Sequence, residues 1–421
     1  MFAVDVKAVP PAALASRLAL LAIPFLMVLL AHTPAPARAA TGGAGQVESP
    51  PPSPATGATP FDRQGMWIWY VDRSDGGSIP RIVARVRAAG IGTLYVKSGD
   101  GGSYWSQFSS ALAGALHRAG LDVCAWQFVY GEKPLAEAKV GAAAVRRGAD
   151  CLVIDAEAQY EGRYAAADRY LRALRARSGA GFPLSLAGFP YVDYHPSFPY
   201  SVFFGPEGAT ANQPQMYWKA IGTSVRAVYE HTYLYNRLWD QPIYPLGQTY
   251  ESPRPGEVLR FRRFAASYGG RAPSWWDWQE TNARAWNALG ETTKGPLPGY
   301  RPVASQPVLR RGSRGDLVVW AQEHLAGAGQ ASLPVTGIYG KQTVAAVRSF
   351  QLSRGLSDDG AISTRTWNAL LAVDPIRMRW SGGKAGTSRS GASASRVLPP
   401  SRPASASIPA KAYEIDPGPA P

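Results

Sequence analysis

Two carboxylates lie two residues apart at the end of an apolar run. The run covers Cys151–Ile154, and Asp155 and Glu157 follow it. An unbroken apolar run of this length is typical of a strand that is buried on both faces. Because side chains alternate along a strand, Asp155 and Glu157 are expected to project from the same face. Such a pair can serve as a general acid beside an anion; the alternative is an acidic loop in solvent.

These carboxylates need elements that position them, and the chain alternates strand and helix signals from Met66 onwards. Strands are predicted at Met66–Tyr70, Thr93–Lys97, Asp122–Tyr130, Cys151–Ile154, Pro183–Phe189, Asn212–Trp218, Pro242–Gln248 and Ser274–Trp278. Helices are predicted at Ile79–Ala89, Gln107–Arg118, Pro134–Arg147, Tyr164–Arg177, Ser224–Leu238, Gly256–Tyr268 and Thr281–Leu289. Eight such units in about 225 residues predict an α/β fold, a (β/α)8 barrel of the TIM type. The Pro- and Phe-rich segment Tyr191–Thr210 is predicted to be a loop over the functional face.

In a barrel of this kind the functional residues lie at the carboxyl ends of the strands. The candidates are Tyr70, Asp72, Lys97, Gln127, Tyr130, Asp155, Glu157, Gln215, Tyr217, Trp218, Gln248, Trp276, Asp277, Trp278 and Gln279. The set combines carboxylates, amides and aromatic rings from different strands on one face. This convergence favours a functional site over a solvated strand end.

Composition limits the partners and cofactors. The formal net charge of +14 favours anionic partners, including the acidic polymers of a bacterial wall, and no nucleic-acid recognition motif is present. The five His residues are scattered and HExxH is absent, so neither a metal site nor a cofactor is predicted. The two cysteines, Cys124 and Cys151, fall in neighbouring predicted strands, where free buried thiols are favoured over a bridge.

The flanking segments predict export. Lys7 and Arg17 precede an apolar run that is too short for a membrane span, and Ala37-Arg38-Ala39 supplies a cleavage site. We therefore predict a signal peptide at 1–39, a flexible linker at 40–62, the barrel at 63–292 and a second linker at 293–305. A separate module at 306–374 and a disordered basic tail at 375–421 complete the chain. The mature protein is expected to be secreted without a stable membrane anchor.

Three short motifs of the barrel resemble those of glycoside hydrolases. They are Asp155-x-Glu157, Gln215–Trp218 (QMYW) and the Trp-rich Ser274–Gln279. The barrel is most similar to the lysozyme-like muramidases of family 25 and more distantly to family 18. Two departures stand out: the first strand, MWIWY, lacks the Asp that family 25 carries, with Asp72 just beyond it, and Val153 replaces an Asp of family 18.

The segment after Gln306 resembles the three-helix type of peptidoglycan-binding domain, followed as far as Val373. The matching residues are Leu309, Arg311, Gly312, Gly315, Val318, Gly337, Gly340, Thr343, Val347, Phe350, Gln351, Gly355, Leu356, Asp359, Gly360, Thr366, Trp367 and Leu370. Most of them have structural roles, so the motif is primarily evidence for a small all-α fold and only then for a binding function. The resemblance implies that this module binds peptidoglycan.

Together the two resemblances imply a secreted hydrolase of cell-wall glycan. Glu157 would be the general acid and Asp155 an anion that stabilises the transition state or orients the N-acetyl group of the substrate. Tyr217 would bind that group. Asp277 is a further candidate for a catalytic carboxylate. Tyr70, Lys97, Gln127, Tyr130, Gln215, Trp218, Gln248, Trp276 and Trp278 would bind substrate, and Trp69 is a further candidate for stacking on sugar rings.

Three other functions remain open from the sequence. The first is a non-catalytic protein that binds glycan through the barrel, which the missing strand-one motif favours. The second is a glycosidase for another polysaccharide, with the C-terminal module as its anchor. The third, a Cys-dependent amidase, is disfavoured because a thiol inside a strand is poorly placed to act as an exposed nucleophile.

Overall fold

The computed structural model describes residues 59–380, so the predicted signal peptide, residues 40–58 of the first linker and most of the predicted tail lie outside the described residues. Its centre is a parallel sheet with the strand order β7-β6-β5-β4-β2-β1-β9-β8. The strands are β1 (Gly65–Ile68), β2 (Thr93–Asp100), β4 (Asp122–Val129), β5 (Cys151–Ala156), β6 (Leu184–Ala187), β7 (Ala211–Asn212), β8 (Leu246–Gln248) and β9 (Ser274–Trp276), and β3 (Ser103–Tyr104) pairs antiparallel to β2. Parallel bridges from Asn212 to Ile243 and from Gln215 to Leu246 join the two edges, which closes the ring.

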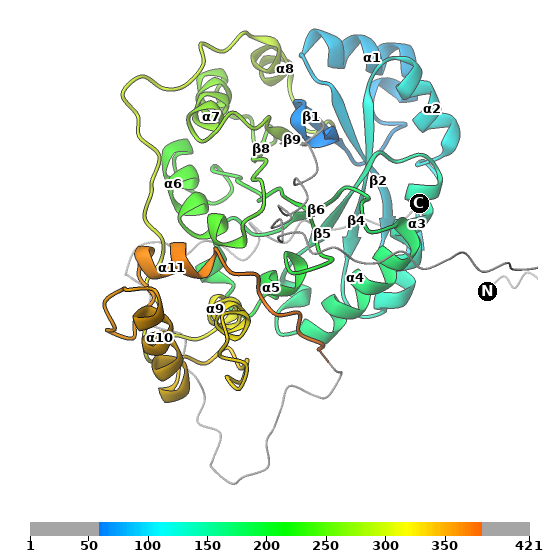
Figure 1. Cartoon of the computed structure of the whole chain (residues 1–421). Coiled ribbons are helices and arrows are strands. Elements are labelled where there is room, and N and C mark those ends of the chain that lie inside the picture. Colours follow the sequence, from blue (N-terminus) through cyan, green and yellow to red (C-terminus); the bar gives the residue numbers. More distant parts are fainter. Residues whose placement is uncertain (1–58, 381–421) are drawn as a thin grey trace, which may run out of the picture. The chain divides into compact units, whose positions relative to one another are not determined.

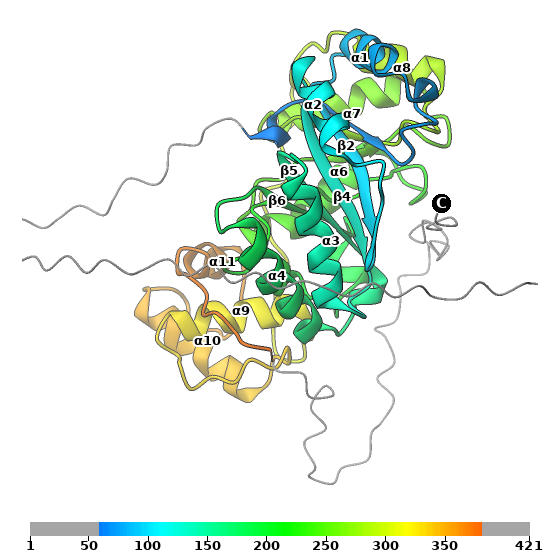
Figure 2. The same ribbon diagram turned by 90° about the vertical axis from the view of Figure 1, so that its right-hand side faces the viewer.

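Helices surround this ring, as Figure 1 and Figure 2 show. They are α1 (Ile79–Ala88), α2 (Ser110–Arg118), α3 (Pro134–Arg146), α4 (Tyr164–Ser178), the short α5 (Tyr200–Phe203), α6 (Val225–Asn236), α7 (Pro255–Ser267) and α8 (Ala283–Gly290). Side-chain caps fix the starts of three of them, where Ser109, Ser224 and Asn282 accept from backbone N–H groups of the first turn. The predicted α/β barrel is confirmed.

The sixth predicted strand differs most from the prediction. It was expected over Asn212–Trp218, but regular pairing stops at Asn212. Pro214 explains the difference, because proline has no N–H with which to continue a ladder. Beyond it the chain turns, with the Tyr217 N–H bound to the Gln215 carbonyl. The side chains of QMYW nevertheless keep the alternation of a strand, because Tyr217 belongs to the interior cluster and Met216 and Trp218 belong to the outer one.

Alternating side chains divide the barrel into an interior and an outer layer. Trp67, Tyr95, Trp126, Val153 and Trp276 come from five strands and pack into one buried cluster, which is the interior. Their neighbours along the strands belong to a second cluster shared with the helices; examples are Ile68, Val96, Ala125, Leu152 and Ile154. Asp155 continues the alternation of Cys151 and Val153, so its strand position faces the interior.

The prediction that Cys124 and Cys151 are free thiols is wrong. Cys124 and Cys151 are directly opposite each other in the register of β4 and β5, and they form a disulfide. Both side chains point into the interior of the barrel and are fully buried. Strand alternation predicts that both face the same way, but not that their registers coincide, which is what permits the bond.

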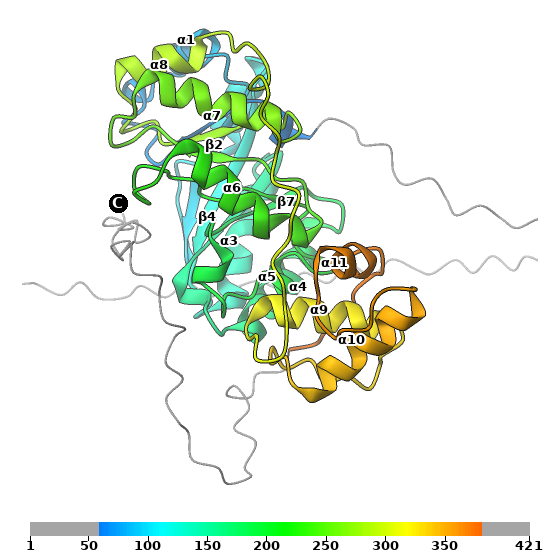
Figure 3. The same ribbon diagram turned by 90° about the vertical axis from the view of Figure 1, so that its left-hand side faces the viewer.

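The C-terminal segment contains three helices, α9 (Asp316–Gly327), α10 (Lys341–Ser353) and α11 (Thr364–Leu370). Val318, Leu325, Val347, Phe350 and Trp367 form their core. A connecting segment leads to them alongside α6 and α7 (Figure 3), where Tyr300 packs on Phe264 and its hydroxyl bonds to Tyr268. In the described part of the chain, no helix is long and apolar enough to cross a membrane.

Candidate active site

Asp155 and Glu157 converge at the carboxyl end of β5, and one amide holds both. Gln215 Nε2 donates to Asp155 Oδ1 at 3.0 Å and to Glu157 Oε1 at 3.1 Å. Gln215 forms an isolated parallel bridge with Leu246, and its side chain faces the interior, as that of Tyr217 does two residues later. The two carboxylates are 2% and 3% exposed, respectively. Gln215 is therefore a clamp between the two carboxylates, and its predicted contact with substrate stays a prediction.

The shared amide limits the distance between the two acids. Both accepting oxygens lie within 3.1 Å of the same nitrogen, so they are no more than about 6 Å apart. Glycosidases that invert configuration separate their carboxyl groups by roughly 6.5–9.5 Å, to leave room for a water, whereas retaining enzymes use about 5–5.5 Å. The limit of about 6 Å applies to these two oxygens, one from each carboxyl group.

Burial controls the protonation of Asp155. Removal from water raises the pKa of Asp155 to about 7, and the nearby charge of Asp100 adds to this rise. The positive charge of Lys97 and the hydrogen bond from Gln215 oppose it. At neutral pH the Asp155 carboxyl can therefore exist in both protonation states, which is the property required of a group that exchanges protons.

Lys97 lies inside the barrel and carries its own counter-ion. Its Nζ is 2.9 Å from Asp100 Oδ2, and Tyr130 Oη donates to the other oxygen of Asp100. The Nζ also lies over the rings of Trp69, Trp105 and Trp126, at 4.2, 4.5 and 4.8 Å from their centres. Burial lowers the pKa of Lys97, and the charge of Asp100 works against this. The site thus contains a lysine side chain that is surrounded by three tryptophan rings and bonded to Asp100.

Tyr217 places a hydroxyl among the acids. Burial raises the pKa of Tyr217 well above its usual value, and the charges of Tyr250, Asp155, Glu157 and Asp277 add to this rise. Its Oη is buried and has no hydrogen-bond partner among the described residues. An unpaired hydroxyl is costly in a protein interior, so its presence beside the carboxyls is a feature that a ligand group could satisfy.

Asp277 lies at the end of β9 and is 3% exposed. Burial raises the pKa of Asp277 to about 7, and the charge of Glu280 contributes to the rise. The preceding residue, Trp276, packs edge-on against Trp69 and Trp126, with ring centres 5.5 and 5.2 Å away. Trp69 also has an indole N–H that is buried without a partner in the described structure.

Several predicted site residues lie elsewhere. Gln127 points outward and donates to the carbonyls of Gly101 and Glu137 beneath α3. Trp218 packs on Phe261 and Trp278 on Trp286, both in the outer layer. Gln248 accepts from the backbone of the turn after β7, and Gln279 links β9 to the end of β1. Tyr70 borders the site, because it stacks on Trp69, whereas Asp72 is exposed beyond it.

Sequence reasoning overlooked Asp100, Trp105 and Trp126. Asp100 was missed because β2 was expected to end at Lys97, whereas it continues to Asp100 through a register shift between Lys97 and Gly99. Trp126 could have been found, because it lies two residues after Cys124 in β4 and therefore faces the same side of the sheet. No group of three or more His, Cys, Asp or Glu side chains suited to a metal ion occurs within residues 59–380.

One family model matches the C-terminal module. Residues 314–370 match a family model described as "Putative peptidoglycan binding domain". A search of curated proteins found no match.

Three solved structures show distant similarity to the chain. "Putative Chitinase A from Streptomyces coelicolor" is 14% identical, with 55% of this chain and 98% of that chain covered and a TM-score of 0.41. A fungal endo-beta-N-acetylglucosaminidase of glycosyl hydrolase family 18 is 12% identical, covering 54% and 96%, with a TM-score of 0.38. The catalytic domain of endolysin ply40 from bacteriophage P40 of Listeria monocytogenes is 12% identical, covering 31% and 67%, with a TM-score of 0.26. The chain thus joins an α/β barrel to a module that matches a peptidoglycan-binding family.

Proposed function

We propose that the protein is a secreted hydrolase of cell-wall glycan, with the barrel at 63–292 as the catalytic part and the module at 306–374 as the wall anchor. The observation that carries this proposal is the clamp of Gln215 on Asp155 and Glu157 inside an aromatic barrel. The match of residues 314–370 supports peptidoglycan as the partner. The Cys124–Cys151 disulfide is consistent with export, since disulfides persist in oxidising compartments.

In the proposed mechanism Glu157 is the general acid that protonates the leaving glycosidic oxygen. Asp155, in its ionised form, orients the N-acetyl group of the substrate, whose carbonyl oxygen attacks the anomeric carbon as the glycosidic bond breaks. Tyr217 Oη donates to that group and so satisfies its own unpaired hydroxyl. Water then opens the cyclic intermediate while Glu157, now ionised, accepts its proton. Because each of the two steps inverts the anomeric carbon, this mechanism retains its configuration overall.

The aromatic rings supply the remaining contacts. Trp69, Trp126 and Trp276 meet at ring distances of 5.2–5.7 Å, and of the three Trp69 is the one that is only half-buried. The unpaired indole N–H of Trp69 can donate to a sugar hydroxyl. Lys97 and Tyr130 are proposed to act through Asp100, on the charge balance of the site, and Asp277 remains a further candidate for a catalytic carboxylate.

The test is release of new reducing ends from purified wall glycan. Glu157→Gln should lower the rate by roughly 10²–10⁴-fold, as expected for an acid–base group, and should leave binding to sedimented walls unchanged. Glu132→Gln is the matched control, because Glu132 is an exposed acid on the loop after β4. Equal release by the Glu157→Gln variant and the parent would refute the assignment. The sugar found at the new reducing end identifies the bond that is cleaved.

A second candidate is a non-catalytic glycan-binding protein. Asp155, Glu157 and Asp277 are each 2–3% exposed, which limits access to the acids. In that case wall binding would persist in the parent and in all the variants, with no reducing ends released above the background of boiled protein.

A further inference from the structure

The first turn of α9 packs directly against the barrel. The Asp316 N–H donates to the Pro196 carbonyl at 2.7 Å, and the Trp320 indole donates to the Leu238 carbonyl at 2.7 Å. Gly315, with φ of 106°, leaves no space for a side chain, because a Cβ there would lie 2.5 Å from the Pro196 oxygen. The module is therefore fitted to this surface of the barrel through its own backbone.

A buried carboxylate forms the centre of this contact. Asp316 is 1% exposed, and it accepts from the N–H and the hydroxyl of Ser201, both at 2.7 Å. The Tyr164 hydroxyl also donates to it. Glu323 lies seven residues further along α9, on the same face of the helix, and is 4% exposed. Two acids of the module are thus enclosed against α4 and α5.

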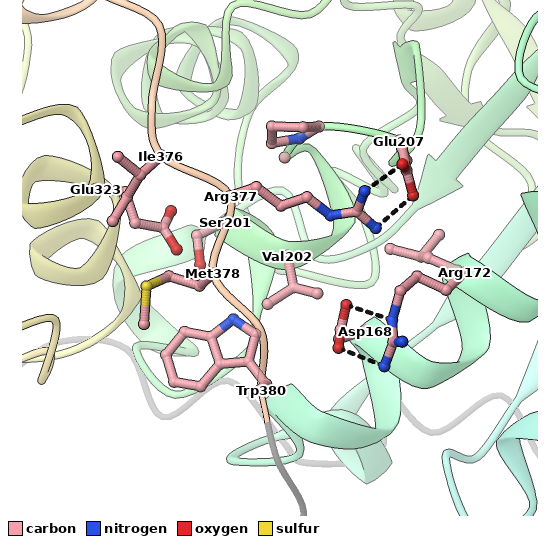
Figure 4. A pocket seen from close by; sticks show the side chains of 13 residues that line it. Asp168, Arg172, Ser201, Val202, Glu207, Glu323, Ile376, Arg377, Met378 and Trp380 are labelled. Carbon is pink, nitrogen blue, oxygen red and sulfur yellow. Dashed lines mark hydrogen bonds and ion pairs between the residues drawn. The ribbon is translucent and has the colours of Figure 1, made fainter. Parts of the chain in front are cut away.

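The positively charged side chains around these two acids bond to other groups. Arg172 pairs with Asp168, and Arg377 pairs with Glu207 through its two terminal nitrogens, Nη1 and Nη2, as Figure 4 shows. Arg175 donates to backbone carbonyls of Phe182, Glu207 and Gly208. Burial lowers the pKa of His324, so this neighbour on α9 is neutral near pH 7. Among the described residues, no cation forms an ion pair with Asp316 or Glu323.

A C-terminal strap, residues 374–380, covers the same contact. The Ile376 N–H donates to the Glu323 carbonyl, and the Trp380 ring packs on Tyr164 with centres 4.6 Å apart. Figure 4 shows the Glu323 carboxyl beneath the strap, facing Ser201 and Met378. The cavity there has a volume of about 30 Å³, the space of one or two water molecules. Bulk water therefore does not solvate these acids while the contact is closed.

We propose that this contact is a proton-controlled latch: Asp316 and Glu323 hold the wall-binding module on the barrel when they are protonated, and their ionisation releases it. An ionised carboxyl loses its hydration on docking, and no cation replaces that hydration here. Opening the contact restores water to both acids. The proposal is independent of whether the barrel cleaves glycan.

The direction of the pH dependence follows from burial. It raises the pKa of Asp316 to about 7 from 3.8, and it raises the pKa of Glu323 well above its usual value, with the charge of Asp316 adding to the rise. The docked state therefore binds more protons than the open state between about pH 4 and 7. Docking is strongest below this window and is weakened as the pH rises through it. For Asp316 alone, the change from pH 5 to 9 corresponds to about a hundredfold in the docking equilibrium.

Hydrogen–deuterium exchange of the full chain tests the latch. The Ser201 and Asp316 N–H groups bond across the contact, so their protection factors, corrected for intrinsic rates, report its opening. These factors should fall by at least about a hundredfold from pH 5 to pH 9, the part that Asp316 alone contributes. The backbone N–H of Ile154 in the barrel ladder is the internal reference and should change much less. A pH-independent protection at Ser201 and Asp316, or a parallel fall at Ile154, would overturn the proposal.

Three variants complete the test. Glu323→Gln keeps the shape but cannot ionise, and it should reduce the pH dependence; adding Asp316→Asn should abolish it. Trp320→Ala removes a contact that does not titrate, so it should lower the protection of the Ser201 amide at every pH and keep the slope. Unchanged protection in Trp320→Ala would show that the contact does not open as a unit, and an unchanged slope in the double variant would exclude both acids as its cause.

Discussion

Lys97 is bonded to Asp100, three residues further along β2, with 2.9 Å between Nζ and Oδ2. Residues three apart on a regular strand point to opposite faces. The register shift between Lys97 and Gly99 adds one residue to the strand, and this brings both side chains to the same side. The bulge therefore places a counter-ion beside a buried lysine, and the pair sets part of the charge balance around Asp155.

Lys97→Met should raise the pKa of Asp155 further. The positive charge of Lys97 is what opposes the rise that burial causes, and a neighbouring opposite charge typically lowers a carboxyl pKa by about 1–3 units. In a pH profile of glycan cleavage, the limb that reports ionisation of Asp155 should move to higher pH by about one unit. Carbon-13 NMR of the Asp155 carboxyl measures the same shift without any substrate.

The exposed Lys139 on α3 provides the matched control. Lys139→Met removes the same charge from the chain but lies outside the barrel interior, so both measurements should match those of the parent. If the Asp155 carboxyl titrates at the same pH in Lys97→Met as in the parent, then Lys97 does not act on it.

Gln215→Leu should separate activity from wall binding. The Gln215 amide makes two hydrogen bonds to carboxyl groups, and bonds of this type contribute about 1.5–3 kcal/mol each. Without them Asp155 and Glu157 lose their relative position, and turnover should fall by about 10²-fold. Sedimentation with walls should be unaffected, because residues 314–370 are unchanged. Loss of both properties together would indicate misfolding, which circular dichroism detects.

Much of this arrangement could be predicted from alternation alone. The period of two placed Asp155 and Glu157 on the same face as Val153, and the order of strands and helices predicted the barrel. Alternation failed where the backbone leaves regular geometry. The register shift after Lys97 brings Asp100 to the same side as Lys97, which alternation does not predict.

Contacts between segments that are distant in the chain could not be predicted from the sequence. The Cys124–Cys151 bond depends on the register between two strands, and the burial of Asp316 depends on how α9 meets α5. Neither follows from local propensity. Asp316 shows this most clearly, because an acid in the first turn of a helix is ordinarily explained by the helix dipole alone.

The buried disulfide should contribute measurably to stability. Its cysteines are 27 residues apart, and closing a loop of that length stabilises the folded state by about 3–4 kcal/mol in the chain-entropy model. The double variant Cys124→Ala and Cys151→Ala should lose about this much free energy of unfolding in urea, and the slope should rise because the unfolded chain without the cross-link exposes more surface. A loss below about 1 kcal/mol would show that packing of the barrel interior dominates over the cross-link.

Tyr217→Phe tests what the unpaired hydroxyl is for. Removing a buried hydroxyl that has no protein partner costs no internal hydrogen bond, so the free energy of unfolding should stay within about 0.5 kcal/mol of the parent or rise. If the hydroxyl binds the N-acetyl group during cleavage, turnover should nevertheless fall by about 10–100-fold. Most substitutions in a buried cluster reduce stability, so this combination distinguishes a ligand-binding group from a packing group. A loss of stability above about 1 kcal/mol, with activity falling in proportion, would instead mean that Tyr217 serves the core.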